Sequence, residues 1–374
     1  LARAELSVRV HGKDILPAAG EYSPEVLERG LRQYLRDMLP DTNALQLRES
    51  VVREAKRVAA ELLSGLPERP PTFCTGCPER PMFTALKLLK REIGPIHTSA
   101  DIGCHALATF PPFNSGHTIL GYGMSLAASA AVARTQARRP ISIMGDGGFW
   151  HNGLITGVAG AAFNDADSVL VVLDNGYSSA TGAQAIPSTV DQRRAQPPTI
   201  ENAVRAVGVK WVRTVRTYDL RSVLATLRDA MTTAERGLKV IVARGECMLQ
   251  VQRRARAADS ERLKRGERVV RVRFGVDEDT CTGDHSCIRL SGCPSLTIKP
   301  NPDPLRRDPV AHVNNGCVGC GLCGEVAHAA RLCPSFYEAR IVQNPTRWDR
   351  LLARVRATVI GWLAPRSDRA GAAS

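Results

Sequence analysis

Eleven cysteines constrain this chain of 374 residues more than any other feature. Seven of them fall between residues 281 and 333, and the other four are spread between residues 74 and 247. The N-terminus lacks the basic and then apolar pattern of a secretory signal, so we expect a cytoplasmic protein whose thiols stay reduced. Clustered cysteines in a reducing compartment favour metal or cluster ligands over a disulfide framework.

The seven C-terminal cysteines belong to two triplets of identical spacing, each followed by a Cys-Pro pair. Two residues separate successive positions in each triplet, and the Cys-Pro pair follows after five residues in the first set and after nine in the second. The first set is Cys281, Asp284, Cys287 and Cys293-Pro294, with an aspartate at the middle position. The second set is Cys317, Cys320, Cys323 and Cys333-Pro334. This pattern resembles the two halves of a bacterial two-cluster ferredoxin.

In such ferredoxins the cysteine before proline ligates the cluster of the other triplet. The resemblance therefore implies one [4Fe–4S] cluster on Cys293, Cys317, Cys320 and Cys323. It implies a second cluster on Cys281, Cys287 and Cys333. Asp284 is either the fourth ligand of that cluster or no ligand, which makes it an oxygen-ligated [4Fe–4S] or a [3Fe–4S] cluster. A zinc module is the alternative, and the repeated Cys-Pro ending argues against it.

Upstream of the cysteine-rich segment, short apolar strands alternate with helices. Strands are expected over 140–144, 168–173 and 238–243, and helices over 151–163 and 219–236. This alternation is typical of a parallel sheet covered on both faces. The predicted fold class is α/β: a doubly wound parallel sheet followed by a small ferredoxin-like α+β iron–sulfur domain.

We expect five segments along the chain. They are an N-terminal connecting region with helices from Ser23-Pro24 and over 44–63 (1–66), the sheet domain (67–250), a basic linker (251–273), the ferredoxin-like domain (274–345), and a tail with a helix over 348–363 (346–374). The linker carries nine Lys and Arg against three acids, a net +6 of the chain's +13. This charge suits an acidic protein partner better than nucleic acid, because no recognition motif accompanies it. We expect no membrane partner, because no apolar run reaches the about 18 residues that a span needs.

One pair of short motifs follows the first two predicted strands. Gly145-Asp146-Gly147-Gly148 ends the strand at 140–144, and Asn175 follows the strand at 168–173. Ligands bind outside the carboxyl ends of parallel strands, glycines allow close approach to a diphosphate, and Asp and Asn oxygens suit Mg²⁺. The pair resembles the thiamine-diphosphate-binding motif, which implies that Asp146, Asn175 and the backbone carbonyl of Tyr177 hold Mg²⁺. A plain strand-to-helix turn is the alternative.

Together the motifs resemble the indolepyruvate ferredoxin oxidoreductase family, in its alpha-subunit region, within the 2-oxoacid:ferredoxin oxidoreductases. The motifs are CTGCPERPMF, ADIGCHALATFPPFNSGHTILGYGMS, GDGGFW and DNGYSSATG, followed by the two-cluster pattern, and they cover about residues 67–345. The resemblance makes 67–250 a thiamine-diphosphate-binding domain. Its implied cofactor contacts are Gly103, Cys104, Gly121, Gly123, Met124, Gly145, Asp146, Gly147, Gly148, Asn175, Tyr177, Thr181 and Gly182.

The resemblance also gives the four remaining cysteines a role. Spacing alone leaves them open as a zinc site, a redox pair or structural thiols, and the family pattern implies a third [4Fe–4S] cluster. These residues are Cys74, Cys77, Cys104 and Cys247.

The implied activity is oxidative decarboxylation of an aryl 2-oxoacid to acyl-CoA and CO₂, with coenzyme A as co-substrate and ferredoxin as electron acceptor. In this family the glutamate that activates the aminopyrimidine comes from a separate N-terminal domain, and nothing in this sequence resembles that domain. We therefore expect either a fragment of a longer protein or a subunit that needs a partner, in a homo- or hetero-oligomer.

Catalytic side chains are not assigned from the sequence, because His105, His117 and His151 near the motifs are more typical of structural histidines. Two other functions stay open. A non-oxidative thiamine-diphosphate decarboxylase or carboligase needs no redox relay, and a non-catalytic electron-transfer protein has no use for the glycine-rich motifs.

Overall fold

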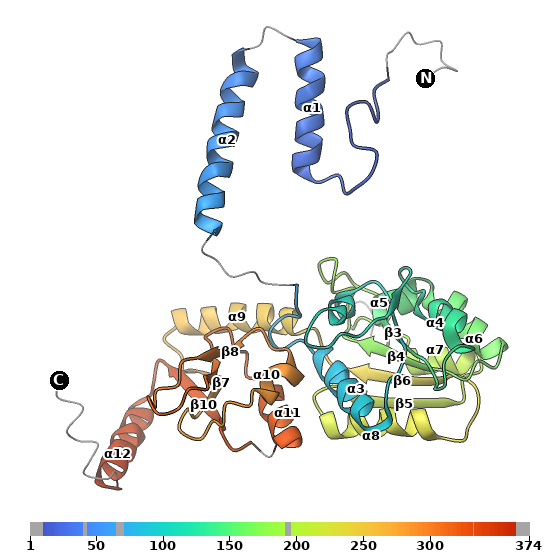
Figure 1. Ribbon diagram of the computed structural model, residues 1–374. Helices are drawn as coiled ribbons and strands as arrows, with labels where there is room; N and C mark the ends of the chain where they lie inside the picture. Colours follow the sequence, from blue (N-terminus) through green and yellow to red (C-terminus); the bar gives the residue numbers. More distant parts are fainter. Residues whose placement is uncertain (1–9, 40–42, 65–70, 191–195, 332, 364–374) are drawn as a thin grey trace. The chain divides into compact units, whose positions relative to one another are not determined.

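The computed structural model describes residues 10–39, 43–64, 71–190, 196–331 and 333–363 (Figure 1). The chain divides into two compact units, residues 1–69 and 70–374. The first unit contains α1 (Pro24–Met38) and α2 (Asn43–Leu63), which confirms the two helices expected there. Pro24 occupies the start of α1, where its missing N–H costs nothing. The predicted boundary around 65–70 lies outside the described residues.

The second unit is built on a sheet of six parallel strands. In spatial order they are β2 (Thr118–Ile119), β1 (Thr98–Ala100), β3 (Ile141–Gly145), β4 (Val169–Asp174), β6 (Lys239–Arg244) and β5 (Trp211–Arg216). The three predicted strands are β3, β4 and β6. The sequence analysis did not predict β1 and β2, which are two or three residues long, or β5, an edge strand with exposed polar positions.

Helices cover both faces of this sheet, as expected for a doubly wound fold (Figure 1). Along β4, Val169, Val171 and Leu173 face one apolar core, while Leu170 and Val172 face the other. The first core includes α3 (Arg80–Ile93) and α8 (Leu220–Thr232). The second includes α4 (Ser125–Ala133), the π-helix η3 (Phe149–Ala159) and α7 (Ile200–Ala206). Strands that are buried on both faces appear in the sequence as continuous apolar runs, which is why β4 was predictable.

The helix expected over 151–163 begins earlier than predicted. Helical backbone starts directly at Asp146 with α5 (Asp146–Gly148) and continues through η3 to α6 (Gly160–Phe163). Gly147 and Gly148 therefore lie in the first helical turn. A Cβ atom on Gly147 would come within 2.2 Å of Tyr122 Oη, and one on Gly148 within 2.1 Å of Asp101 Oδ2. A side chain at either position would clash with a neighbouring residue, so glycine is needed here for packing even without a bound ligand.

The cysteine-rich region combines two small antiparallel sheets with short helices. Its elements are β7 (Val269–Val276) paired with β10 (Phe336–Gln343), β8 (Leu296–Lys299) paired with β9 (Val310–Val313), α10 (Ser286–Ser291) and α11 (Leu322–Arg331). The expected C-terminal helix is α12 (Arg347–Leu363). In the described part of the chain no helix is long and apolar enough to cross a membrane.

The segment 251–273, expected as a basic linker, is mostly regular structure. Helix α9 (Met248–Lys264) occupies its first part, and β7 begins at Val269. No side chain of α9 is buried, so its charges are solvated. Arg271 of β7 pairs with Asp259 of α9 at 3.0 Å, which ties the helix to the strand that follows it.

Candidate active site

Asp146 and Asn175 meet at the carboxyl ends of two neighbouring strands. Gly145, the last residue of β3, lies beside Leu173 of β4 in the register of the sheet. Asp146 Oδ2 accepts hydrogen bonds from the backbone N–H groups of Asn175 (2.9 Å) and Gly176 (2.7 Å). The loop that carries Asn175 is thus held against the first turn of the helix.

Buried carboxylates gather at this point. Asp146 is 1% exposed, and burial raises its pKa well above the usual range. The nearby carboxylates of Asp174 and Glu79 shift the pKa of Asp146 in the same direction, because like charges disfavour ionisation. Such a concentration of oxygen ligands with too little positive charge favours a divalent cation.

A small cavity of about 30 Å³ lies between these groups. Eight of the predicted cofactor positions line it: Gly103, Cys104, Gly145, Asp146, Gly147, Gly148, Asn175 and Tyr177. The sequence analysis did not assign a cofactor contact to the other lining residues, which are Glu79, Ile102, His105, Tyr122, Ser178, Ser179 and Ala180. Their polar groups continue the wall that the glycine motif begins.

Five predicted contacts lie further away. Thr181 lines an adjoining cavity of about 490 Å³, together with Gly103, Tyr122, Gly147 and His151. Gly182 lies in the same turn at φ +110°, and Gly121, Gly123 and Met124 form the loop before α4. The N–H of Gly123 donates to Asp101 Oδ1 at 2.6 Å, and burial raises the pKa of Asp101 to about 6. None of these five lines the small cavity.

Glu79 is the functional candidate that sequence reasoning missed. Its side chain is buried, and its Oε1 accepts a hydrogen bond from Asn175 Nδ2 at 3.0 Å. Burial raises the pKa of Glu79 to about 7, and its Oε2 has no hydrogen-bond partner among the described residues. Because the amide nitrogen of Asn175 points to Glu79, its Oδ1 faces away and accepts from Ser179 Oγ at 2.7 Å. An acidic residue two positions after Cys77 is the only signal that the sequence offers.

The three histidines differ in environment. His105 is 1% exposed, and burial lowers its pKa to about 4. His117 Nδ1 accepts a hydrogen bond from the backbone N–H of Thr98 at 2.9 Å, which fits a structural role. His151 lies against Tyr122, with 5.2 Å between ring centroids, and lines the 490 Å³ cavity.

The four upstream cysteines approach the same loop. Cys77 N donates to Cys74 O at 3.1 Å in a tight turn, and Cys247 N donates to the backbone carbonyl of Asn175 at 3.1 Å. Burial raises the pKa of Cys104 to about 12, and the nearby charges of Cys74 and Cys247 act in the same direction. Asn175 therefore contacts both cysteine-bearing segments, one through Glu79 and one through Cys247.

The seven C-terminal cysteines and Asp284 line two small cavities, in the two sets that the ferredoxin resemblance implies. Cys293, Cys317, Cys320 and Cys323 line one of them. Cys281, Asp284, Cys287 and Cys333 line the other. All eleven cysteines lie in the described part of the chain, and none forms a disulfide. Within that part, no three His, Cys, Asp or Glu side chains converge closely enough to hold a single metal ion.

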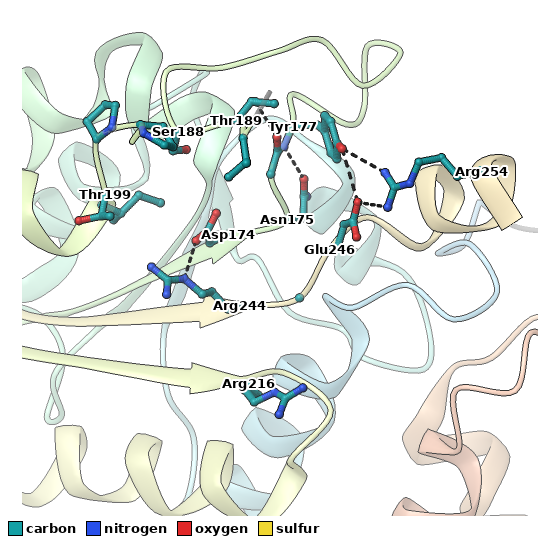
Figure 2. A pocket seen from close by; sticks show the side chains of 16 residues that line it. Asp174, Asn175, Tyr177, Ser188, Thr189, Thr199, Arg216, Arg244, Glu246 and Arg254 are labelled. Atoms are coloured by element: carbon teal, nitrogen blue, oxygen red, sulfur yellow. Dashed lines mark hydrogen bonds and ion pairs between the residues drawn. The ribbon is translucent and has the colours of Figure 1, made fainter. Parts of the chain in front are cut away.

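A larger cavity, about 970 Å³, also borders the Asn175 loop (Figure 2). It shares Asn175 and Tyr177 with the small cavity but includes none of the Gly145–Gly148 turn. Its charged groups are largely paired: Arg244 with Asp174 at 3.1 Å, and Arg254 with Glu246 at 2.5 Å (Figure 2). The buried carboxylates and the glycine turn identify the smaller cavity, in spite of its size, as the better site for a diphosphate and its metal.

Comparisons with known proteins find similar sequences. Residues 101–243 match the family described as thiamine pyrophosphate enzyme, C-terminal TPP binding domain. The chain is 30% identical over 338 residues to the indolepyruvate oxidoreductase subunit IorA of Archaeoglobus fulgidus, covering 89% of this chain and 48% of that protein. It is 29% identical over 343 residues to the subunit IorA of Thermococcus kodakarensis, covering 86% of this chain and 48% of that protein.

The chain thus spans about half the length of the curated relatives that it matches. Among solved structures, it is similar to a 2-oxoglutarate:ferredoxin oxidoreductase from Magnetococcus marinus. That likeness has a TM-score of 0.42 and 18% identity, and it covers 48% of this chain and 66% of the other.

Proposed function

Because this chain contains a C-terminal TPP-binding domain of the thiamine pyrophosphate enzymes and is a relative of the indolepyruvate oxidoreductase IorA subunits, we propose that it takes part in thiamine-diphosphate-dependent oxidation of an aryl 2-oxoacid such as indolepyruvate. The reaction forms acyl-CoA and CO₂ from the 2-oxoacid and coenzyme A, and its electrons pass to ferredoxin. The observation that carries the proposal is the position of Asn175, which links a diphosphate site to cysteine-bearing segments on both sides.

The residues of the small cavity fit the diphosphate end of the cofactor. Asp146 and Asn175 offer oxygens for Mg²⁺, with the carbonyl of Tyr177 nearby, and Glu79 orients the Asn175 amide. Among the described residues no Lys or Arg forms an ion pair with Asp146 or Glu79, which agrees with a metal-binding role. Thiamine diphosphate, when bound, supplies the carbanion stabilisation that decarboxylation of a 2-oxoacid requires. The adjoining 490 Å³ cavity, which opens from the same glycine turn, offers room for the rest of the cofactor.

The cysteine sets fit iron–sulfur clusters better than zinc. A cluster is larger than one ion, so its thiolates stand further apart than those around a single metal. This agrees with two cysteine-lined cavities in which no three ligands converge on a point. Clusters supply one-electron redox chemistry, which distinguishes the proposed reaction from non-oxidative decarboxylation. We propose clusters on the two C-terminal sets, with Asp284 beside the second, and a third cluster on Cys74, Cys77, Cys104 and Cys247.

The proposed enzyme needs more than this chain. The curated relatives are named as subunits and are about twice as long as the matched region. We therefore propose that another domain or subunit supplies the glutamate that activates the aminopyrimidine. Residues 67–250 then form the cofactor-binding domain and 274–345 the electron-relay domain, in a cytoplasmic complex.

Anaerobic purification with iron, sulfide and zinc analysis tests the redox half of the proposal. About eleven to twelve irons per chain are expected for three clusters, and about eight would leave the four upstream cysteines without one. A colourless protein with stoichiometric zinc would overturn the oxidoreductase assignment.

Titration with thiamine diphosphate in the presence and absence of Mg²⁺ tests the other half. Binding that requires Mg²⁺ is expected, and absence of binding in both conditions contradicts a cofactor role. Adding an aryl 2-oxoacid, coenzyme A and a viologen dye to the chain with its partner separates the alternatives. Dye reduction supports oxidation, whereas CO₂ release without dye reduction favours the non-oxidative decarboxylase.

A further inference from the structure

Arg80 is a fully buried arginine at the first position of α3. Its side chain is 0% exposed, and its Nη1 donates to the backbone carbonyl of Ser291, the last residue of α10, at 2.9 Å. Its Nε and Nη2 are also buried and have no hydrogen-bond partner among the described residues. A buried guanidinium with two unused nitrogens is strongly unfavourable unless an anion lies against it.

The cavity beside Arg80 identifies where that anion would lie. Arg80 lines the cavity that contains Cys293, Cys317, Cys320 and Cys323. Its other walls are mostly apolar, including Phe274, Leu296, Val313 and Val318, and none of the described residues that line it is a carboxylate. The negative partner of Arg80 must therefore be the thiolates of this cavity and whatever they hold.

We propose that Arg80 donates hydrogen bonds to the sulfur atoms of an iron–sulfur cluster held by Cys293, Cys317, Cys320 and Cys323 and thereby raises the reduction potential of that cluster. A cluster ligated by four thiolates carries a net negative charge, which increases on reduction. A nearby cation and N–H donors stabilise the reduced form more than the oxidised form. The planar guanidinium directs several donors at once, which a lysine cannot do. This inference rests on the iron–sulfur part of the proposed function.

Arg80 also lies near the junction of the two cysteine-bearing regions. Tyr218 Oη donates to the carbonyl of Gly76, between Cys74 and Cys77. A Cβ on Gly76 would come within 2.4 Å of Val318 Cγ2, so the two cysteine loops pack directly on each other. Arg80 is a lining residue of the Cys317 cavity and follows the Cys74–Cys77 turn by three residues, so it lies between the two cysteine groups. A higher potential on that side favours electron flow from the upstream group towards the C-terminal clusters.

The test is a redox titration of the anaerobically purified full chain, monitored by visible absorption and EPR. Arg80→Gln removes the charge, Arg80→Lys keeps the charge but loses the planar set of donors, and Arg228→Gln serves as the control because Arg228 is exposed on α8. We expect Arg80→Gln to reduce the equilibrium constant for one-electron reduction of one cluster at least tenfold, a shift of about 59 mV to lower potential. Arg80→Lys should give a smaller shift in the same direction, and Arg228→Gln none. The affected signal should be the one that Cys320→Ser abolishes.

Each result of the redox titration and iron analysis either supports or overturns the role proposed for Arg80. A wild-type chain with full iron content and an Arg80→Gln variant with unchanged potentials would mean that Arg80 only supports packing. If Arg80→Gln cannot retain the cluster, Arg80→Lys decides: retention supports the role of the charge, and loss of iron from both variants but not from the control overturns it. A wild-type chain without iron removes the proposed clusters and this inference together, which distinguishes failure of the proposed function from failure of the Arg80 assignment alone.

Discussion

The sheet and the cysteine-rich region differ in the side chains that they bury. In the sheet, every position of β4 from Val169 to Leu173 is at most 1% exposed, and helices pack on both faces. In the cysteine-rich region, β10 has no buried side chain among its eight. The separate buried cluster of this region has seven members: Cys281, Cys287, Leu296, Val310, Ala311, Cys323 and Ala327. The sheet therefore has a large apolar core on each face, whereas the second region has a small cluster of its own and contributes Leu290, Leu322 and Val326 to one core of the sheet.

The same contrast applies to the two kinds of site. Asp146 and Asn175 are positioned by the register of β3 and β4 and by backbone hydrogen bonds. The C-terminal cysteines lie mostly on loops and short helices, where only a shared ligand would hold them at fixed distances. In the second region ligand binding and folding are expected to be coupled, as in other small domains with metal ligands.

The largest effect is expected from Cys323→Ser, which removes a ligand from the core of the cysteine-rich region. We expect loss of iron and rapid hydrogen exchange over β7 to β10, while the amides of β3 and β4 stay protected, because the sheet has its own core. Hydrogen exchange with mass spectrometry measures both regions in one experiment. Ile298→Ala is the control, since Ile298 is 52% exposed on β8. Protection of both regions in the cysteine variant would show that the thiols are not needed for folding.

Asp146→Asn should separate ligand binding from folding in the sheet. The Mg²⁺-dependent affinity for thiamine diphosphate should fall at least 100-fold, or about 3 kcal/mol, because a carboxylate ligand is lost. The stability of the cofactor-free protein should change much less. One backbone donor loses its acceptor, but repulsion with Asp174 and Glu79 is relieved. Calorimetric titration and thermal unfolding measure the two effects. Asp174→Asn, whose carboxylate pairs with Arg244, should leave the affinity far less changed.

Acid should weaken the sheet through His105. Its pKa in the folded protein is about 4, below the usual value of 6.5, because burial disfavours the charged ring. Between these values the unfolded chain binds a proton that the folded chain does not, so stability falls as the pH decreases from 6.5 towards 4. At pH 5 this difference lowers the free energy of unfolding by about 2 kcal/mol relative to neutral pH.

His105→Gln should remove this part of the acid sensitivity. Urea unfolding at pH 7.5 and pH 5 measures it, and His328→Gln, at an exposed site, is the control. An equal loss of stability on acidification in the His105 variant and the wild type would contradict the assignment.

The smallest effect tests the contact between the two regions. Gly76→Ala places a Cβ within 2.4 Å of Val318 at φ +72°, whereas Gly208→Ala, at φ +97°, meets no atom within 4 Å. Both substitutions should lose about 1 kcal/mol from the left-handed backbone. Gly76→Ala should lose about another 1 kcal/mol or more from overpacking. Equal melting temperatures for the two variants would mean that the cysteine loops do not pack as described.

Much of the fold was readable from local pattern. The strands β3, β4 and β6 are continuous apolar runs because both of their faces are buried. Helices α1, α2, α8 and α12 follow apolar periodicity and start signals. The strands β1 and β2 are too short to show a periodic pattern. Helix α9 and part of β7 are expected as a linker because α9 buries no side chain and therefore shows no apolar periodicity.

The apolar runs predicted that Asp146 and Asn175 follow strands, and the ferredoxin resemblance predicted how the seven C-terminal cysteines and Asp284 divide between two sets. These features are periodic or closely spaced in the chain, so they are visible in the sequence. Only the tertiary structure decided the roles of Glu79 and Arg80. Glu79 meets Asn175 across 96 residues, and Arg80 meets Ser291 across 211. Burial at such contacts depends on how distant segments pack, and local sequence does not encode which charged side chain loses its solvent.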